Sequence, residues 1–293
     1  MSDAMVAQVR RFNRLVTERV GALEDRYLAR SRPLGEARVL WEIGDGGCDV
    51  RSLRSRLQLD SGYLSRLLRS LEAAGLVDVG PNERDRRVRT ARLTPAGVAE
   101  RCVLDRRSDE LARSFLEPLG AAQRARLASA MGEVERLLTA ALVDVESVDP
   151  TEPAAQHCLN AYFAEIDRRF DTGFDAALSS APGVDSMRPP AGLFLVATLR
   201  GEPVGCGGLQ LHGDAPPDIK RMWVAESARG LGIGRRLLAE LEDRARAHGS
   251  HVVRLETNRT LSEAINLYRS SGYHEVEAFN DERYADHWFE KRL

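Results

Sequence analysis

The chain has 293 residues, 43% of them hydrophobic, which is enough for two globular domains that each bury a core. It contains no run of about 18 apolar residues, and its first residues are charged and helically patterned, so we expect neither a membrane span nor a secretory signal. These features favour a cytoplasmic protein. The four cysteines are scattered without a C-x-x-C pair, so we expect neither a disulfide framework nor a metal site.

Charge differs between the two halves of the chain. Before Val148 there are 25 Arg, no Lys and 22 acidic residues, and the arginines gather at 51–69 and 84–92, whereas the second half is acidic. A guanidinium binds phosphate through two parallel hydrogen bonds in one plane. The clustered arginines therefore indicate that the first half of the chain binds nucleic acid.

Two prolines and a loss of apolar periodicity mark the segment ESVDPTEP. Such a segment is typical of a junction between domains. We therefore predict a mostly α domain over 1–146, a linker over 147–153 and a mixed α/β domain over 154–293.

The first domain begins with helical periodicity over 6–27 and 34–44. Asp49 is expected to cap a short helix, and Asp60 a second one that ends at Gly75. Leucines form the buried stripe of this second helix, which leaves its small hydroxyls and arginines facing outward. Such a face suits the major groove of DNA, and its members are Ser61, Tyr63, Ser65, Arg66 and Arg69.

Two runs follow in which apolar and polar residues alternate, Leu76 to Val79 and Val88 to Leu93. They are joined by a Gly-Pro-Asn turn and a basic tip. They predict a two-stranded wing, so the elements together form a winged helix-turn-helix. The wing residues expected to contact DNA are Arg84, Arg86, Arg87 and Arg89.

The stretch LRSRLQLDSGYLSRLLRSLEAAGLV, the Asp85-x-Arg87 wing motif and LTPAG resemble the MarR (multiple antibiotic resistance regulator) family over about residues 5–145. The resemblance implies that the second helix of the pair reads the major groove, that the wing contacts the DNA backbone or minor groove, and that the first and last helices form a dimer. Independently, apolar residues near a heptad spacing predict a partner helix, at Leu127, Met131, Val134, Leu138 and Ala141. A dimer implies a pseudo-palindromic operator on double-stranded DNA.

In the second half, predicted strands and helices alternate, with strands at 193–200, 204–212, 218–224 and 252–258. A glycine-rich turn stands between the third of these strands and an amphipathic helix that runs to His248. The dinucleotide motif G-x-G-x-x-G is excluded because its third glycine would fall at Arg235, and the Gly-Lys-Ser/Thr of a nucleoside-triphosphate loop is absent.

The turn itself is expected to bind a compact pyrophosphate, because alternate glycines let backbone N–H groups converge at the positive end of a helix. It resembles the R/Q-x-x-G-x-G/A loop of the GNAT (Gcn5-related N-acetyltransferase) superfamily, as do KRMWV before it and Asn258 with EAINLYRSSGY after it, over about residues 152–293. The resemblance implies acetyl-CoA as the cofactor. The residues that it assigns to cofactor binding are Met222, Trp223, Val224, Arg229, Gly230, Leu231, Gly232, Ile233, Gly234, Arg235, Asn258 and Tyr268.

Acetyl transfer to an amine needs a proton acceptor, a donor to the developing oxyanion and an acid for the departing thiolate. The resemblance gives the last two roles to the Val224 amide and Tyr268. For the base, Asp218 competes with Glu226, Glu256 and a water relay. An acceptor pocket is expected from the first helices of the domain, where four aromatic residues recur at helical spacing: Tyr162, Phe163, Phe170 and Phe174. An aromatic stripe at this spacing usually belongs to the hydrophobic core.

Three functions remain open from the sequence. The first is a dimeric transcriptional regulator fused to a working N-acetyltransferase for a small molecule or protein. The second is a regulator whose C-terminal domain senses acetyl-CoA without catalysis. The third is an acetyltransferase whose winged helix only mediates dimerisation, which the arginine-rich wing argues against.

Overall fold

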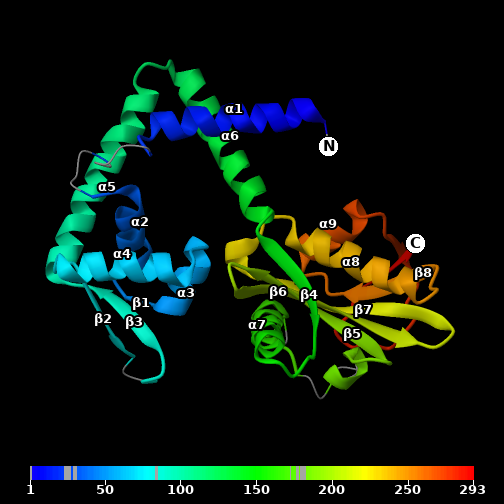
Figure 1. Cartoon of the computed structure of the whole chain (residues 1–293). Helices are drawn as coiled ribbons and strands as arrows, with labels where there is room; N and C mark the ends of the chain where they lie inside the picture. Colours follow the sequence, from blue (N-terminus) through cyan, green and yellow to red (C-terminus); the bar gives the residue numbers. More distant parts are fainter. Residues whose placement is uncertain are drawn as a thin grey trace. The chain divides into compact units, whose positions relative to one another are not determined.

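The computed structural model describes residues 2–22, 28, 32–82, 85–171, 173–175, 178 and 183–293. It divides into two compact units, 1–130 and 131–293, and each is described by itself (Figure 1). The predicted fold classes are confirmed: the first unit is mostly helical with a small sheet, and the second is a mixed α/β domain.

Local capping fixes the helices of the first unit. Asp49 accepts hydrogen bonds from the Arg51 and Ser52 amides and begins α3 (Val50–Leu57), and Asp60 accepts one from the Tyr63 amide and begins α4 (Ser61–Ala73). These predicted caps are confirmed. The unit also contains α1 (Asp3–Arg19), α2 (Leu34–Ile43) and α5 (Pro95–Leu116). Its core is built mainly from leucines of α2, α3 and α4, with Leu104 of α5.

The wing is part of a three-stranded antiparallel sheet in the order β1-β3-β2. Its strands are β1 (Cys48–Asp49), β2 (Val77–Pro81) and β3 (Arg89–Leu93). The predicted hairpin is therefore present, but β1 adds a strand that the sequence analysis missed, because two residues carry no alternation. A glycine is required where α5 meets the wing, since a Cβ on Gly97 would lie 2.0 Å from the Leu76 carbonyl oxygen.

Two helices differ from the others in burial. Neither α1 nor α6 (Ala121–Ala140) contains a buried residue. The first is also shorter than its predicted range of 6–27, since it ends at Arg19 and Gly21 takes a positive φ of 64°. The last predicted residues of that range, 23–27, lie outside the described residues.

The predicted linker at 147–153 lies between two elements of the second unit. Val143–Val148 forms β4, which pairs with β5 (Gly192–Leu199), and α7 begins at Pro153 (Pro153–Arg169). Pairing with a strand about 50 residues away gives Ser147 and Val148 regular structure that their local sequence does not indicate, while 149–152 form neither helix nor strand. Helix α6 itself crosses the division at 130/131.

The second unit is built on a seven-stranded sheet in the order β4-β5-β6-β7-β8-β10-β9. Its further strands are β6 (Glu202–His212), β7 (Ala215–Val224), β8 (Val252–Thr257), β9 (His274–Val276) and β10 (His287–Arg292). All neighbouring pairs are antiparallel except β7 and β8.

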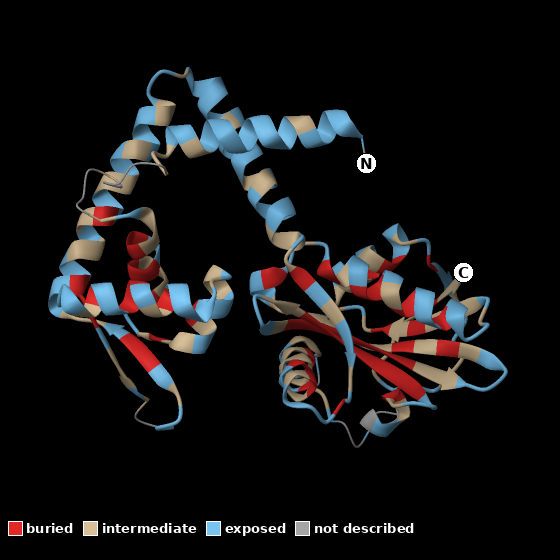
Figure 2. Cartoon of the chain, viewed as in Figure 1, coloured by how far each residue is buried: buried red, intermediate tan, exposed pale blue. Residues whose placement is uncertain are grey.

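Helices cover both faces of this sheet. Along β5, Phe194 and Val196 pack against α7, while Leu193 and Leu195 on the opposite face belong to the cluster with α8 (Ile233–Ala247) and α9 (Ser262–Ser270). Figure 1 shows α7 on one side of the strands and α8 and α9 on the other. The longest continuous runs of buried residues lie on β5 and β6, at 192–197 and 204–209, within the sheet shown in red in Figure 2. Alternation along a strand with two covered faces explains this three-layer packing.

Candidate functional site

The site begins where β7 and β8 diverge. These parallel strands are bridged only at Asp218 and Arg254 within the described chain, and the register between β6 and β7 shifts between the Gly208–Lys220 and Cys206–Trp223 pairs. At this irregularity Arg221 has a φ of 57°, a left-handed conformation. The divergence leaves the end of β7 open on its β8 side.

The glycine loop follows β7 directly. After a single turn of 3-10 helix (η4, Glu226–Ala228), Gly230 and Gly232 take positive φ angles of 82° and 77°. Gly232 is the N-cap of α8, and no side chain caps the helix. The first N–H groups of α8 therefore remain available for an anion, which the helix dipole also favours.

A cavity of about 510 Å³ lies over this loop, and we call it the loop cavity. Ten of the predicted cofactor residues line it: Met222, Trp223, Val224, Arg229, Gly230, Gly232, Ile233, Gly234, Arg235 and Tyr268. Two do not. Leu231 packs against the hydrophobic core, and Asn258 hydrogen-bonds the Tyr284 carbonyl and the Thr260 amide and hydroxyl.

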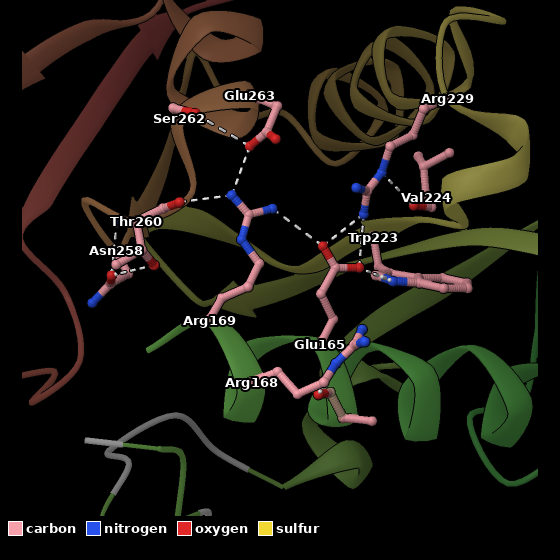
Figure 3. Close-up of polar contacts among 11 residues, drawn as sticks. Glu165, Arg168, Arg169, Trp223, Val224, Arg229, Asn258, Thr260, Ser262 and Glu263 are labelled. Carbon is pink, nitrogen blue, oxygen red and sulfur yellow. Dashed lines mark hydrogen bonds and ion pairs between the residues drawn. The ribbon is translucent and has the colours of Figure 1, made fainter. Parts of the chain in front are cut away.

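Arg229 is held by a carboxylate that the sequence analysis did not identify. Its Nη2 donates to both carboxylate oxygens of Glu165 at 2.6 and 2.7 Å, and its Nε donates to the Val224 carbonyl at 3.2 Å (Figure 3). Trp223 Nε1 donates to the same carboxylate at 2.9 Å. Nothing in the local sequence of α7 indicates this contact, because Glu165 and Arg229 are 64 positions apart.

Arg169 connects Glu165 to the loop before α9. Arg169, one turn further along α7, donates to Glu165 at 3.2 Å, to the Thr260 carbonyl at 2.6 Å and to Glu263 at 2.8 Å (Figure 3). Burial by itself raises the pKa of Glu165, but hydrogen bonds from Arg229, Trp223 and Arg169 outweigh it, and the pKa lies below its usual value. Glu165 is therefore a charged tie between three elements around the loop cavity.

A second, smaller cavity of about 80 Å³ adjoins the first, and we call it the aromatic cavity. Three of the four predicted aromatic residues line it, Tyr162, Phe170 and Phe174, while Phe163 stacks on Phe174 behind them. Tyr284, from the segment before β10, also lines it but was not predicted. The two cavities share Tyr162, Ile166, Met222, Leu261, Ala264 and Tyr268.

Tyr268 of α9 stands at the junction of the two cavities. Its side chain is buried, and its hydroxyl forms no hydrogen bond with another described residue. Burial raises its pKa well above the usual value, and the nearby Tyr162 and Glu256 raise it further. The phenol is therefore protonated at neutral pH and can donate a proton.

The structure separates the carboxylates considered as bases. Asp218 and Glu226 line neither cavity, and Asp218 instead lies beside His212 at 3.2 Å and Lys220 at 3.5 Å. Glu256 lines the aromatic cavity, where it forms an ion pair with Lys220 and accepts a long hydrogen bond of 3.4 Å from Asn280. Glu282, which the sequence analysis did not consider, also lines this cavity and is buried.

In the first unit, most of the predicted DNA-facing residues are exposed. Ser65 is half-buried, and Arg84 lies outside the described residues. The exposed positions are Ser61, Tyr63, Arg66 and Arg69 on α4 and Arg86, Arg87 and Arg89 on the wing. Asp85 accepts a hydrogen bond from the Arg87 amide at 3.0 Å and so fixes the turn at the wing tip.

Comparison with known proteins identifies both units. Residues 154–273 match the model of the acetyltransferase (GNAT) family, and 31–88 match that of the MarR family. The IAA acetyltransferase of Azospirillum brasilense is 35% identical over 123 residues, which are 42% of this chain and 80% of that protein. The chain belongs to the GNAT acetyltransferase family. Its GNAT domain is joined to a MarR domain that spans α2 to β2, so both predicted resemblances are confirmed.

Two further matches concern the GNAT domain. The N-alpha-acetyltransferase RimI of Mycobacterium tuberculosis is 33% identical over 129 residues, which cover 43% of this chain and 76% of that protein. A solved acetyltransferase of the GNAT family from Staphylococcus aureus is 17% identical, with a TM-score of 0.44, and covers 52% of this chain and 99% of its own.

GNAT acetyltransferase domains use acetyl-CoA. The loop cavity fits this cofactor on three observations: an uncapped helix N-terminus, glycines above which nothing lies within 4 Å of a would-be Cβ, and flanking arginines. The glycine loop and the α8 N-terminus would hold the pyrophosphate.

Among the described residues, no helix is long and apolar enough to cross a membrane.

Proposed function

We propose that the protein is a dimeric, DNA-binding transcriptional regulator whose GNAT domain transfers an acetyl group from acetyl-CoA to an amine. The enzymatic half of this proposal rests on one observation. The loop cavity and the aromatic cavity adjoin at Tyr268, so a cofactor in one and an acceptor in the other would meet beside an unengaged phenol. A regulator that needs both DNA and acetyl-CoA would act in the cytoplasm.

Three groups of the GNAT domain supply the chemistry in this proposal. Acetyl-CoA brings the acetyl group as a thioester. Tyr268 donates a proton to the leaving thiolate, since its phenol lines both cavities and forms no hydrogen bond with another described residue. The Val224 amide, at the end of β7 in the loop cavity, stabilises the carbonyl oxygen on which charge develops. Glu256 accepts the proton of the attacking amine, and it replaces Asp218 as the base because it lines the aromatic cavity.

The regulatory half rests on the exposed face of α4 and the wing. Hydroxyls and arginines on one helix face, with further arginines at a hairpin tip, suit the phosphates and base edges of double-stranded DNA. A dimer would present two such helices to the half-sites of a pseudo-palindromic operator. Apolar side chains that are more than half exposed support a dimer formed by α1 and α6, among them Met5, Val9 and Leu15 on α1 and Met131, Leu137 and Leu138 on α6.

The enzymatic proposal is tested with Tyr268→Phe. We expect kcat for amine acetylation to fall about 100-fold or more, since a positioned acid contributes about 10² to 10⁴. The affinity for acetyl-CoA, measured by calorimetry, should change little because only the hydroxyl is removed. Tyr273→Phe is the matched control, since Tyr273 is equally buried, 5.9 Å from the Tyr268 ring, and lines neither cavity.

A different result would favour a second function. Wild-type protein that binds acetyl-CoA but acetylates no amine in a broad panel would identify the GNAT domain as a non-catalytic acetyl-CoA sensor. Equal activity of Tyr268→Phe and wild type would show that the phenol is not the acid.

A further inference from the structure

Arg221 is a cation that lines the aromatic cavity. Its guanidinium lies 5.0 Å from the centre of the Phe163 ring and 5.7 Å from that of Tyr162. Among the described residues it forms no ion pair. The neighbouring Lys220, in contrast, is paired with both Glu256 and Asp218.

A half-buried guanidinium loses part of its hydration and is normally compensated by an anion. Aromatic rings stabilise a cation only partly, by about 0.5 to 2 kcal/mol. The planar fork of Arg221 therefore still has N–H donors for a carboxylate, which it can bind through two parallel hydrogen bonds.

The backbone at this position supplies an independent argument. Arg221 has a φ of 57° at the register shift of β7, a conformation that costs a residue other than glycine about 1 to 2 kcal/mol. A glycine would meet the backbone requirement without that cost. The side chain of Arg221 is thus retained in spite of strain, which favours a role for its charge in the cavity.

Other residues of the same cavity suit an amine. Tyr268 and the carboxylate of Glu256 both line it, and its walls also include Phe170, Phe174 and Tyr284. The rings of these three residues lie 4.9 to 6.2 Å apart and form one apolar surface. A volume of about 80 Å³ limits the acceptor to a compact molecule.

We propose that the acceptor is a small amino acid with an apolar side chain, whose carboxylate binds Arg221 and whose amine faces Tyr268 and Glu256. This inference rests on the proposed acetyltransferase function and specifies its substrate class. In the reaction, the amine nitrogen forms an amide bond to the acetyl carbon, the thioester bond breaks, Glu256 receives the amine proton and Tyr268 protonates the thiolate.

The test compares acceptors that differ only at the carboxylate. L-leucine, L-leucinamide and isoamylamine are assayed with wild type, Arg221→Met, Arg221→Lys and the control Arg168→Met, which removes an exposed arginine of α7. We expect wild type and the control to prefer L-leucine over both other amines by about 10- to 100-fold in kcat/KM, the range for a hydrogen bond to a charged group. Arg221→Met should abolish the preference, and Arg221→Lys should retain part of it.

Binding provides a second readout that needs no turnover. N-acetyl-L-leucine and its methyl ester are titrated onto the protein saturated with coenzyme A. Binding of the acid but not the ester, lost in Arg221→Met with coenzyme A affinity unchanged, supports the inference even for an inactive domain.

Two outcomes separate the inference from the function on which it rests. Acetylation of all three amines at similar rates by wild type and Arg221→Met would overturn the amino acid and leave the acetyltransferase intact. Acetyl-CoA binding without acetylation of any amine, but with selective binding of N-acetyl-L-leucine, would overturn the acetyltransferase and leave the Arg221 site intact. No turnover and no binding of the acid would overturn both.

Discussion

At the scale of single residues, the candidate site contains charged groups whose partners come from distant parts of the chain. Glu165 is the clearest case. Its carboxylate, whose side chain is only 15% exposed, receives hydrogen bonds from Arg229, Trp223 and Arg169 and so ties α7 to β7 and to the glycine loop. Hydrogen bonds to a buried charge contribute more than those between exposed groups, because water does not compete for them.

We therefore expect Glu165→Gln to lower the free energy of unfolding of the GNAT domain by about 1 to 3 kcal/mol at pH 7. The folded-state pKa of Glu165 lies below its usual value, so the stabilisation by the carboxylate is complete above about pH 4.3 and is lost as pH falls through the folded pKa. The difference between wild type and variant should accordingly shrink below about pH 4 in denaturant titrations.

The control for this pH dependence is Glu240→Gln. Glu240 also forms an ion pair with an arginine, Arg244, but its side chain is 39% exposed on α8. An exposed pair contributes about 0 to 1 kcal/mol, so this variant should be close to wild type at every pH. A Glu165→Gln variant that is as stable as Glu240→Gln would contradict the structural role of Glu165.

At the scale of elements, the N-terminus of α8 is organised for an anion. The N-cap Gly232 has a left-handed backbone, no side chain competes for the first N–H groups, and open space lies where a Cβ would stand. These properties come from the loop and the helix together. The glycines give the loop its conformation, and the packing of α8 on the sheet through Leu237 and Leu241 fixes the helix behind it.

Replacement of Gly232 by alanine should lower stability by about 1 to 2 kcal/mol, because φ is 77°, and should also weaken acetyl-CoA binding measurably by calorimetry. Gly213→Ala is a matched control. Gly213, in the turn between β6 and β7, has a φ of 61°, equally open surroundings and no place in either cavity. The Gly213→Ala variant should lose comparable stability but keep its affinity for acetyl-CoA. Equal acetyl-CoA affinities of the Gly232→Ala and Gly213→Ala variants would argue against a pyrophosphate site at this helix.

At the scale of the whole molecule, α6 is the element that joins the MarR domain to the GNAT domain along the chain. It carries the exposed apolar side chains of the proposed dimer, crosses the division between the units, and leads through Ala141 and Leu142 into β4 of the GNAT sheet. A helical connection transmits a change at either end more directly than a flexible linker does.

We expect acetyl-CoA to change the affinity of the protein for its operator by about 5-fold or more, in the usual range of allosteric coupling. Fluorescence anisotropy with DNA from upstream of the protein's own gene measures this at fixed salt. DNA must then change the affinity for acetyl-CoA by the same factor. Insertion of two glycines after Ala141 should leave each affinity intact and reduce the factor to one. Specific DNA binding that ignores acetyl-CoA in the uninterrupted chain would mean that the two functions are merely tethered.

The sequence by itself determined what depends on a few neighbouring residues. The caps at Asp49 and Asp60 and the alternation of apolar and polar residues in the wing strands follow from short-range sterics and hydrogen bonds, and the structure contains both. Since the glycine loop and its flanking motifs are also contiguous, both families could be predicted from the sequence.

Only the tertiary structure decided which distant groups meet. Strand β4 forms because β5 supplies a partner, Arg229 contacts Glu165 across 64 positions, and Glu256 rather than Asp218 lines the aromatic cavity. The isolated charge of Arg221 likewise emerges only when its neighbours are known. Such contacts depend on the packing of whole helices and strands, and this packing cannot be inferred from a few neighbouring residues in the sequence.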